Sequence, residues 1–433
     1  MHKIEHPQIQ ETLYHEKLSN GLEVYILPKP EFSKTYATFT TKYGSIDNTF
    51  QVPGQDKINV PDGIAHFLEH KMFEQETGED VFQEFARQGA SANAFTSFTR
   101  TAYLFSCTDH VEQNLSTLLN FVQSPYFTDQ NVEKEKGIIG QEIRMYDDNP
   151  DWRSYFGLIE AMYQKHPVKI DIAGTVESIS KITKETLYTC YETFYHPNNM
   201  LLFLVGPVEP DAMINLIKEN QARKSFKQQP EIKRFFEEEP DKVAEKKKEV
   251  QLSVGISKCL FGFKEGKAAI GHTGESLLKQ ELTTSIVLEA LVGPSSELYQ
   301  SLYDDGLVDD NFGYDYTLEK GYGFSMMGGD TPDPNRLLER IQSEIPPLVE
   351  RGISEEAFER IRKKKVGSSL RFLNSPEWIA NQFTSYRFND TDLFRIIPLL
   401  ESLTLEEVNQ RMKEHLNWDR FAVSLVRPLQ EQN

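Results

Sequence analysis

The sequence predicts two homologous α+β halves that arose by internal duplication. In each half an amphipathic helix precedes an apolar strand, and the two copies share residues at several aligned positions. The matched positions are Thr183 with Thr404, Glu185 with Glu406, Leu204-Val205 with Leu425-Val426, and Pro207 with Pro428. An earlier pair aligns Val81-Phe82-Gln83 with Leu298-Tyr299-Gln300, and Gly89 with Gly306. A chain of 433 residues is also too long for a single hydrophobic core.

The halves are predicted to meet at a charged linker. Residues 224–248 are rich in Lys, Glu and Pro and lack apolar periodicity, which is typical of an exposed connection. We therefore expect one domain at 1–223, a linker at 224–248 and a homologous second domain at 249–433.

Composition excludes several classes of function. A net charge of −19 disfavours nucleic-acid binding, because the phosphate backbone would be repelled. No stretch approaches the ~20 apolar residues of a membrane span. The N-terminal residues lack the apolar segment of a secretory signal. Three widely spaced cysteines argue against a disulfide framework, so we expect a reducing, cytoplasmic location.

The most informative motif is His66-Phe67-Leu68-Glu69-His70. On a helix, residues four apart share one face, so His66 and His70 can point at one metal ion. The order H-x-x-E-H is the inverted form of a zinc-peptidase motif. In such a site the carboxylate of Glu69 takes a proton from water as general base. Alone, the pattern also fits an ordinary solvated helix, so a third ligand is needed.

Residues 131–148 supply candidates for that ligand. Their pattern predicts a helix with Ile138, Ile139, Ile143 and Tyr146 as an apolar stripe. Glu135 and Glu142 lie two helical turns apart and so project from the same face. One carboxylate can complete a His2Glu zinc site while the other orients a ligand. A solvated acidic helix would give the same letters.

Together these features resemble the insulinase/pitrilysin-like family of zinc metallopeptidases, in particular its half-length bacterial branch. In that family the inverted motif precedes, by roughly seventy to eighty residues, a helix with two glutamates seven apart. Here Glu142 lies 72 residues after His70. The resemblance implies one Zn²⁺ per chain held by His66, His70 and Glu142, with Glu69 as general base and Glu135 in support. It also implies two domains, each a mostly antiparallel sheet packed with helices.

Further segments extend the resemblance. Asn93-Ala94-Phe95-Thr96 looks like the family's edge-strand motif, which implies that Asn93, Ala94 and Phe95 bind a peptide substrate as an added strand. Residues 195–206 resemble a late strand of the catalytic domain, and residues 174–179 are also similar to the family.

The second half departs from the catalytic pattern. Aligning the motif with residues 285–290 places Ile286 and Ala290 where the histidines would stand, and only Glu289 remains. Many active relatives carry an arginine and a tyrosine in a segment resembling residues 302–309. Here Tyr303 and Asp309 occupy those positions. Either another residue serves, such as Tyr303, or a related second chain supplies the pair. The latter is favoured, as a heterodimer, with a homodimer as the alternative.

The sequence therefore predicts a zinc-dependent endopeptidase that hydrolyses peptides or unfolded segments with a partner subunit. Two alternatives remain open. One is a non-catalytic scaffold or peptide-binding subunit, and the other is a maturation accessory that uses zinc only for structure. Retention of Glu69 beside both histidines favours catalysis.

Overall fold

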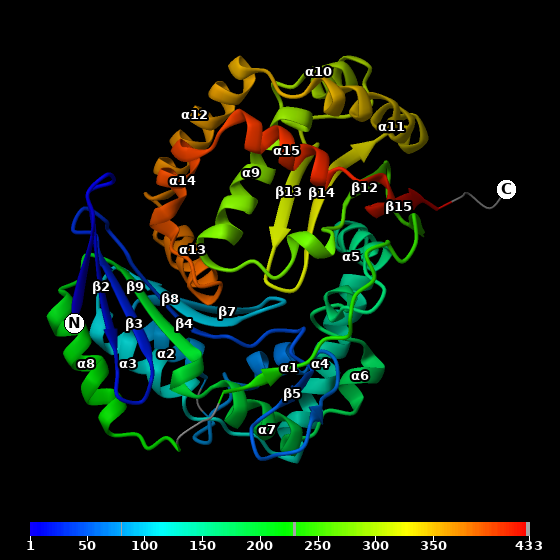
Figure 1. The fold of residues 1–433 in the computed structure, drawn as a ribbon. Coiled ribbons are helices and arrows are strands. Elements are labelled where there is room, and N and C mark those ends of the chain that lie inside the picture. The colour runs from blue at the N-terminus through cyan, green and yellow to red at the C-terminus, as the bar shows by residue number, and fades with distance from the viewer. Residues whose placement is uncertain (79, 228–230, 430–433) are drawn as a thin grey trace. The chain divides into compact units, whose positions relative to one another are not determined.

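The computed structural model describes residues 1–78, 80–227 and 231–429. The chain forms two compact units, each assembled from segments that are not contiguous in sequence (Figure 1). Unit 1 contains Met1–Ile143, Ile170–Phe236 and Phe372–Phe388, and unit 2 contains Arg144–Lys169, Glu237–Arg371 and the chain from Asn389 onwards.

Unit 1 is built on a seven-stranded sheet in which only β3 and β9 pair in parallel. In spatial order its strands are β1 (His2–His6), β2 (Glu11–Lys17), β3 (Glu23–Pro28), β9 (Met200–Gly206), β4 (Thr35–Thr41), β8 (Thr101–Cys107) and β7 (Ala90–Thr96). The central strands β4 and β9 are buried along their whole length, whereas β7 forms one edge. A small sheet accompanies them, made of β10 (Lys233–Arg234), β5 (Thr49–Gln51) and β6 (Ile58–Asn59).

Helices cover both faces of this sheet, with α3 and α8 on one side and α13 on the other (Figure 1). The helices of the unit are α1 (Ile64–Lys71), α2 (Val81–Arg87), α3 (Val111–Val122), α4 (Asp129–Asp147, which ends in unit 2), α6 (Val176–Ser180), α7 (Lys184–Phe194), α8 (Pro210–Ala222) and α13 (Pro376–Phe388), with a 3-10 turn η2 (Pro197–Asn199).

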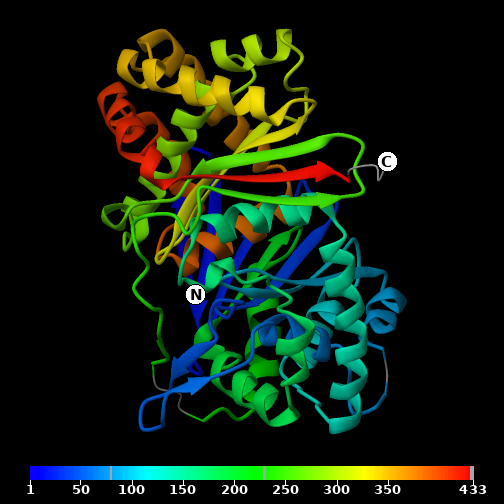
Figure 2. The same cartoon turned by 90° about the vertical axis from the view of Figure 1, so that its right-hand side faces the viewer.

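Unit 2 has a five-stranded sheet in which β15 lies between β11 and β12 (Figure 2). Its strands, in spatial order, are β11 (Lys247–Leu252), β15 (Phe421–Pro428), β12 (Ser257–Phe263), β14 (Gly323–Thr331) and β13 (Gly313–Leu318). Its helices are α5 (Pro150–Met162), α9 (Gly274–Val292), α10 (Glu297–Asp304), α11 (Pro334–Arg351), α12 (Glu355–Phe372), α14 (Ile396–Ser402) and α15 (Leu405–His415), with 3-10 turns η1 (Pro167–Lys169), η3 (Lys267–Ala269), η4 (Leu393–Arg395) and η5 (Trp418–Arg420).

The two sheets share one topology, so the predicted α+β duplication is confirmed. The order β3-β9-β4-β8-β7 in unit 1 corresponds to β11-β15-β12-β14-β13 in unit 2. In each sheet the first pair is parallel and the other pairs are antiparallel. The aligned threonines also agree, because Thr183 and Thr404 each cap the helix before the last strand with a capping box.

Two helices are exchanged between the halves. By chain order α5 belongs to the first half, yet it packs on β11, β15 and β12 of unit 2. Its counterpart α13 follows α12 but packs on unit 1, where Phe383 contacts the rings of Tyr25 and Phe203 at 4.9 and 4.6 Å between centroids. Each sheet therefore depends on a helix from the other half, which the sequence did not reveal. The boundaries at 223 and 249 stay a prediction of where the homologous halves meet.

The linker is more ordered than its composition predicts. Arg234 pairs with the buried Asp47 at 2.8 Å, and Val243 is buried. The Glu239 carboxylate accepts hydrogen bonds from three consecutive backbone amides that end at His166. Residues 228–230 lie outside the described residues, and the part from 231 to 248 is not simply an exposed connection. Along the described part of the chain, none of the helices combines the length and apolar composition that a membrane crossing requires.

Candidate metal centre

Helix α1, which carries the motif, starts after Gly63, a position where the backbone geometry requires glycine. Gly63 has a φ of 86°, and a Cβ there would lie 2.3 Å from the carbonyl oxygen of Ala173. From this start, Phe67 and Leu68 are fully buried in the core of unit 1. The remaining motif residues share the other side of the helix, as the helical period requires.

Helix α4 presents the predicted glutamates. Val132, Ile139 and Ile143 are buried and anchor it to the core, as predicted for the last two. Ile138, in contrast, is 46% exposed, so its place in the predicted apolar stripe is wrong. It directly precedes the buried Ile139, and the rotation of about 100° per residue turns its side chain out of the core.

The two helices bring His66, His70 and Glu142 together. His66 Nε2 lies 3.6 Å from Glu142 Oε1, and His70 Nε2 lies 3.6 Å from Glu142 Oε2. Within the described residues this trio is the one group of metal-type ligands found, with one donor atom from each residue within 4.8 Å of the others. Residues far apart in sequence thus converge on one point.

The donor set fits zinc. Two imidazoles and a carboxylate are the ligands of many catalytic zinc sites, which leave a fourth position open. Donors about 2.0–2.2 Å from one ion in tetrahedral geometry are separated by roughly 3.3–3.6 Å. The separations of 3.6 Å between the imidazole nitrogens and the Glu142 oxygens fall in that range. They are too long for ordinary hydrogen bonds.

Burial keeps one histidine ready for a metal. Burial, together with the neighbouring His70, lowers the pKa of His66 to about 3, so its imidazole is neutral at pH 7. Burial alone would lower the pKa of His70, but its bond to Glu135 and the surrounding carboxylates raise it overall. Burial raises the pKa of Glu69, although the hydrogen bond from Thr96 opposes this. A raised pKa suits a carboxylate that must accept a proton.

Glu135 contacts His70 at Nδ1, the ring nitrogen that does not face Glu142. Its Oε1 lies 3.1 Å from His70 Nδ1, and its Oε2 lies 3.6 Å from the ammonium of Lys71. Burial opposes ionisation of this carboxyl, but His70 and Lys71 outweigh it and lower its pKa. Glu135 therefore occupies the place that sequence reasoning gave to a supporting carboxylate.

Thr96 is a partner of the site that sequence reasoning missed. It ends strand β7, and its Oγ1 donates a 2.6 Å hydrogen bond to Glu69 Oε2. The backbone of Thr96 also helps to lower the pKa of the Glu69 carboxyl, against the effect of burial. The only signal in the sequence was its place at the end of the edge-strand motif.

The three predicted substrate-binding residues lie in β7 but differ in what they offer. In an antiparallel ladder, bonded and non-bonded pairs alternate, and Ser97 N donates to Arg100 O at 2.8 Å. Counting back, the backbone groups of Phe95 and Asn93 face β8, whereas those of Ala94 face away from it. The Ala94 amide is bonded by Asn93 Oδ1 at 2.9 Å.

The segment aligned with the missing arginine and tyrosine lies in unit 2. Tyr303 lies in the last turn of α10 and is 45% exposed. Residues 302–309 contain no lysine or arginine, but α11 brings Arg340 to this segment, where it pairs with Asp305 and donates to Ser301 Oγ at 2.6 Å. Arg340 also pairs with Glu344. It is therefore held by protein carboxylates.

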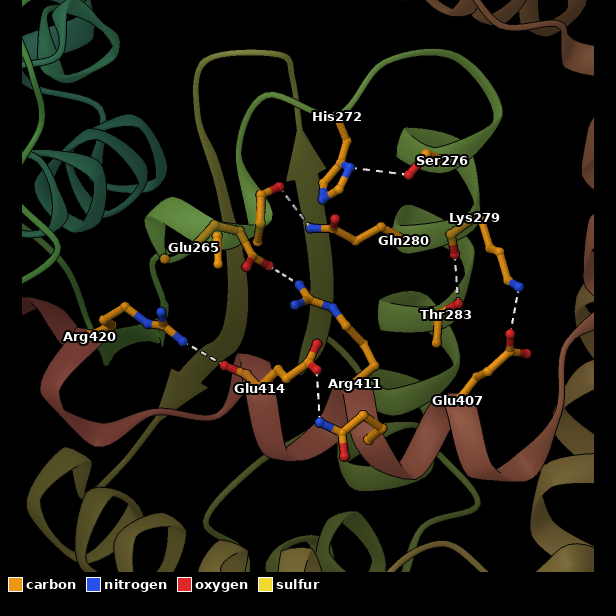
Figure 3. Close-up of a pocket in the computed structure, with 14 residues that line it drawn as sticks. Glu265, His272, Ser276, Lys279, Gln280, Thr283, Glu407, Arg411, Glu414 and Arg420 are labelled. Carbon is orange, nitrogen blue, oxygen red and sulfur yellow. Dashed lines mark hydrogen bonds and ion pairs between the residues drawn. The ribbon is translucent and has the colours of Figure 1, made fainter.

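A cavity of about 580 Å³ in unit 2 is lined, among the described residues, by paired charges and not by a group of metal-type ligands (Figure 3). Glu265 on its wall is paired with Arg411 and with His415, and Lys279 is paired with Glu407. Charges of both signs neutralise one another across the cavity. None of its residues belongs to the metal-type group found among the described residues.

Comparison with known proteins identifies the family. The family profile "Insulinase (Peptidase family M16)" matches residues 57–176, and "Peptidase M16 inactive domain" matches residues 181–365. The uncharacterized zinc protease YmfH of Bacillus subtilis (strain 168) is 59% identical over 426 residues, which is 98% of this chain and 99% of that protein. This chain belongs to the insulinase family.

Other similarities agree with that placement. The uncharacterized zinc protease YmxG of the same organism is 26% identical over 382 residues, covering 84% of this chain and 88% of that protein. The crystal structure of a putative M16-like peptidase from Alicyclobacillus acidocaldarius has a TM-score of 0.93 at 47% identity, covering 97% of this chain and 99% of that chain. Pitrilysin shares the fold, with a TM-score of 0.75 at 16% identity, and this chain corresponds to 47% of its length.

Proposed function

We propose that this chain is a zinc-dependent endopeptidase that hydrolyses peptides or unfolded segments. His66, His70 and Glu142 would hold one zinc ion, and Glu69 acts as the general base. The observation that carries the proposal is the convergence of these four groups from α1 and α4, with Glu69 bonded to the edge strand that would receive a substrate. Homologues named zinc proteases support the same class of activity.

The residues divide the work of hydrolysis. A bound zinc ion supplies Lewis-acid chemistry, which acidifies water and polarises a carbonyl. Glu69 accepts the proton of the attacking water and returns it to the leaving amine. Thr96 holds one oxygen of Glu69, which leaves the other oxygen to handle the proton. Glu135 fixes the ring of His70 through Nδ1.

The edge of β7 supplies the substrate-binding surface. A peptide that adds as a further strand would pair with the outward backbone groups of Ala94. Because Asn93 Oδ1 bonds the Ala94 amide, the Asn93 side chain must move aside or share that amide when a peptide arrives. Phe95 contributes its side chain and not its backbone bonds to such a complex.

We propose that a related subunit supplies the missing arginine and tyrosine, which in many active relatives bind the substrate carbonyl and stabilise the oxyanion of the tetrahedral intermediate. Tyr303 and Asp309 stand where relatives carry the arginine and tyrosine, and Arg340 is engaged by carboxylates of unit 2. We expect the heterodimer to be the active form. Light scattering would give the mass of the purified chain, and peptide cleavage would be measured on the same sample. A homogeneous homodimer with full peptidase activity would contradict this proposal.

The decisive experiment compares Glu69→Gln with wild type on a mixed peptide library read by mass spectrometry. The substitution keeps the shape and removes the base, so cleavage should fall by about 10²–10⁴-fold while zinc content, measured by plasma emission spectroscopy, stays near one per chain. Glu289→Gln is the matched control, because it makes the same change at the aligned position of unit 2. Wild type that holds zinc but stays silent, even with candidate partner chains added, would favour a scaffold.

A further inference from the structure

Lys71 is the most unusual charged residue of unit 1. It ends helix α1, directly after His70, and its side chain has no exposed surface. Its Nζ lies 2.8 Å from Glu74 Oε2 and 3.6 Å from Glu135 Oε2. The proposed hydrolysis does not use it.

A buried ammonium is costly unless carboxylates surround it. Transfer of a lysine charge out of water costs several kcal/mol, which paired carboxylates offset only with good geometry. Glu74 is itself 34% exposed and also lies 3.9 Å from Lys134, so it is partly shared with solvent and with a second cation. Glu135, with 7% side-chain exposure, is the buried partner of Lys71.

The two oxygens of Glu135 therefore serve two different groups. Oε1 meets His70 Nδ1 at 3.1 Å, and Oε2 faces the Lys71 ammonium. A carboxylate held at one oxygen only can rotate about its terminal torsion, which is broad. The ion pair with Lys71 at Oε2 restricts that rotation, so the carboxylate presents a fixed acceptor to the imidazole and directs His70 Nε2 toward Glu142.

We propose that Lys71 is a positioning residue of the metal centre: it locks Glu135, and through Glu135 it orients the His70 ring for zinc. The proposal rests on the proposed function, because it assumes that zinc binds the trio. Lys71 acts on zinc retention and touches neither the ion nor the substrate. Helix α1 thus carries the proposed ligand His70 and, as the next residue, Lys71, which holds the Glu135 carboxylate in place beside His70.

The test measures zinc affinity by competition with a fluorescent chelator on the full-length chain. Lys71→Met keeps most of the side-chain volume and removes the charge. We expect zinc to bind about 10–100-fold more weakly, the usual effect of losing an outer-sphere partner. Lys224→Met is the control, since Lys224 is a part-buried lysine whose Nζ donates to Leu119 O and Gln123 Oε1. It should leave zinc affinity unchanged.

A double-mutant cycle with Glu135→Gln separates positioning from general destabilisation. If Lys71 acts through Glu135, Lys71→Met should change zinc affinity less than threefold in the Glu135→Gln background. Equal losses in both backgrounds, or unchanged affinity in the single variant, would overturn the proposal. Should the methionine variant not fold by circular dichroism, Lys71→Gln gives the same test, with at least a tenfold loss expected. Wild type that binds no zinc would instead refute the proposed function itself.

Discussion

The same scaffold carries a charged glutamate twice, once in α1 of unit 1 and once in α9 of unit 2. In unit 1, Glu69 accepts a 2.6 Å bond from Thr96 on the edge strand β7. In unit 2, Glu289 accepts a 2.6 Å bond from Tyr314 on the equivalent edge strand β13. Both glutamates are buried, so both need a cation nearby.

The two units meet that need differently. Unit 1 places two imidazoles and a carboxylate beside Glu69, a set that suits a metal ion. Unit 2 places Lys364 of α12 2.5 Å from Glu289, and Lys365 bonds Ser285 and Tyr314. Burial opposes ionisation of Glu289, but Lys364 and Tyr314 outweigh it and lower its pKa. In unit 2 a lysine side chain thus stands beside the buried glutamate, where unit 1 would have the proposed zinc ion.

Removing the proposed zinc ion should give the largest difference in stability between the two units. With zinc at a thousandfold excess over its dissociation constant, binding stabilises the native state by about 4 kcal/mol. A chelator should therefore lower the melting temperature seen by calorimetry and speed amide exchange in α1 and α4. Helices α9 and α12 should keep their protection in the same exchange experiment. Equal deprotection in both units would mean that the centres are not independent.

The buried ion pair of unit 2 should give the next largest effect. Glu265 lies beside Arg411 and His415. Burial would raise the pKa of Glu265, yet His415 and Arg411 outweigh it and hold it well below the usual range. Glu265→Gln leaves Arg411 buried without its counter-charge, so we expect a loss of about 3 kcal/mol in unfolding free energy. Urea unfolding at pH 7 measures it.

The pH dependence of that loss has a defined sign. Because the pKa of Glu265 is lower in the folded than in the unfolded state, where it is about 4.3, its contribution is full above that value. It disappears as the pH falls toward the folded pKa. Wild type should therefore lose its advantage over Glu265→Gln between roughly pH 5 and 2. A gap that stays constant over this range would contradict the assignment.

Neutralising Glu289 should have a smaller and purely structural effect. Glu289→Gln weakens the bond to Lys364, whose side chain is 51% exposed, so the pair is partly screened. We expect unfolding free energy to fall by about 1–2 kcal/mol. Zinc content and peptide cleavage should remain at wild-type values. A drop in zinc content would show that unit 2 contributes to the centre after all.

The smallest expected effect comes from the N-terminal caps of two equivalent helices, one in each unit. Thr183 and Thr404 each cap their helix, α7 or α15, with a capping box, which Thr186 closes in α7 and Glu407 closes in α15. Thr183→Ala and Thr404→Ala should each cost about 1 kcal/mol by thermal unfolding, and the two losses should add in the double variant. Unequal losses would mean that the two helices contribute differently despite their common origin.

Much of the candidate site was accessible from the sequence because it depends on local periodicity. Residues four or seven apart on a helix share a face whatever surrounds them, so His66 with His70 and Glu135 with Glu142 could be paired from their spacing. The duplication was visible for a similar reason, since caps and strand patterns recur in register. Ile138 marks the limit of such reasoning, because an apolar residue at the border of a stripe can face either way.

What remained depends on which distant segments exclude water from one another. The letters place Lys71 beside His70, but its burial and its contact with Glu135 require α4 to lie against α1. Thr96 meets Glu69 because an edge strand passes that helix, and Arg340 reaches Asp305 only through the packing of α11. The exchange of α5 and α13 left no local trace, since an amphipathic helix fits either homologous sheet. Spacing along one helix is set by the chain itself, whereas burial and pairing are set by long-range packing.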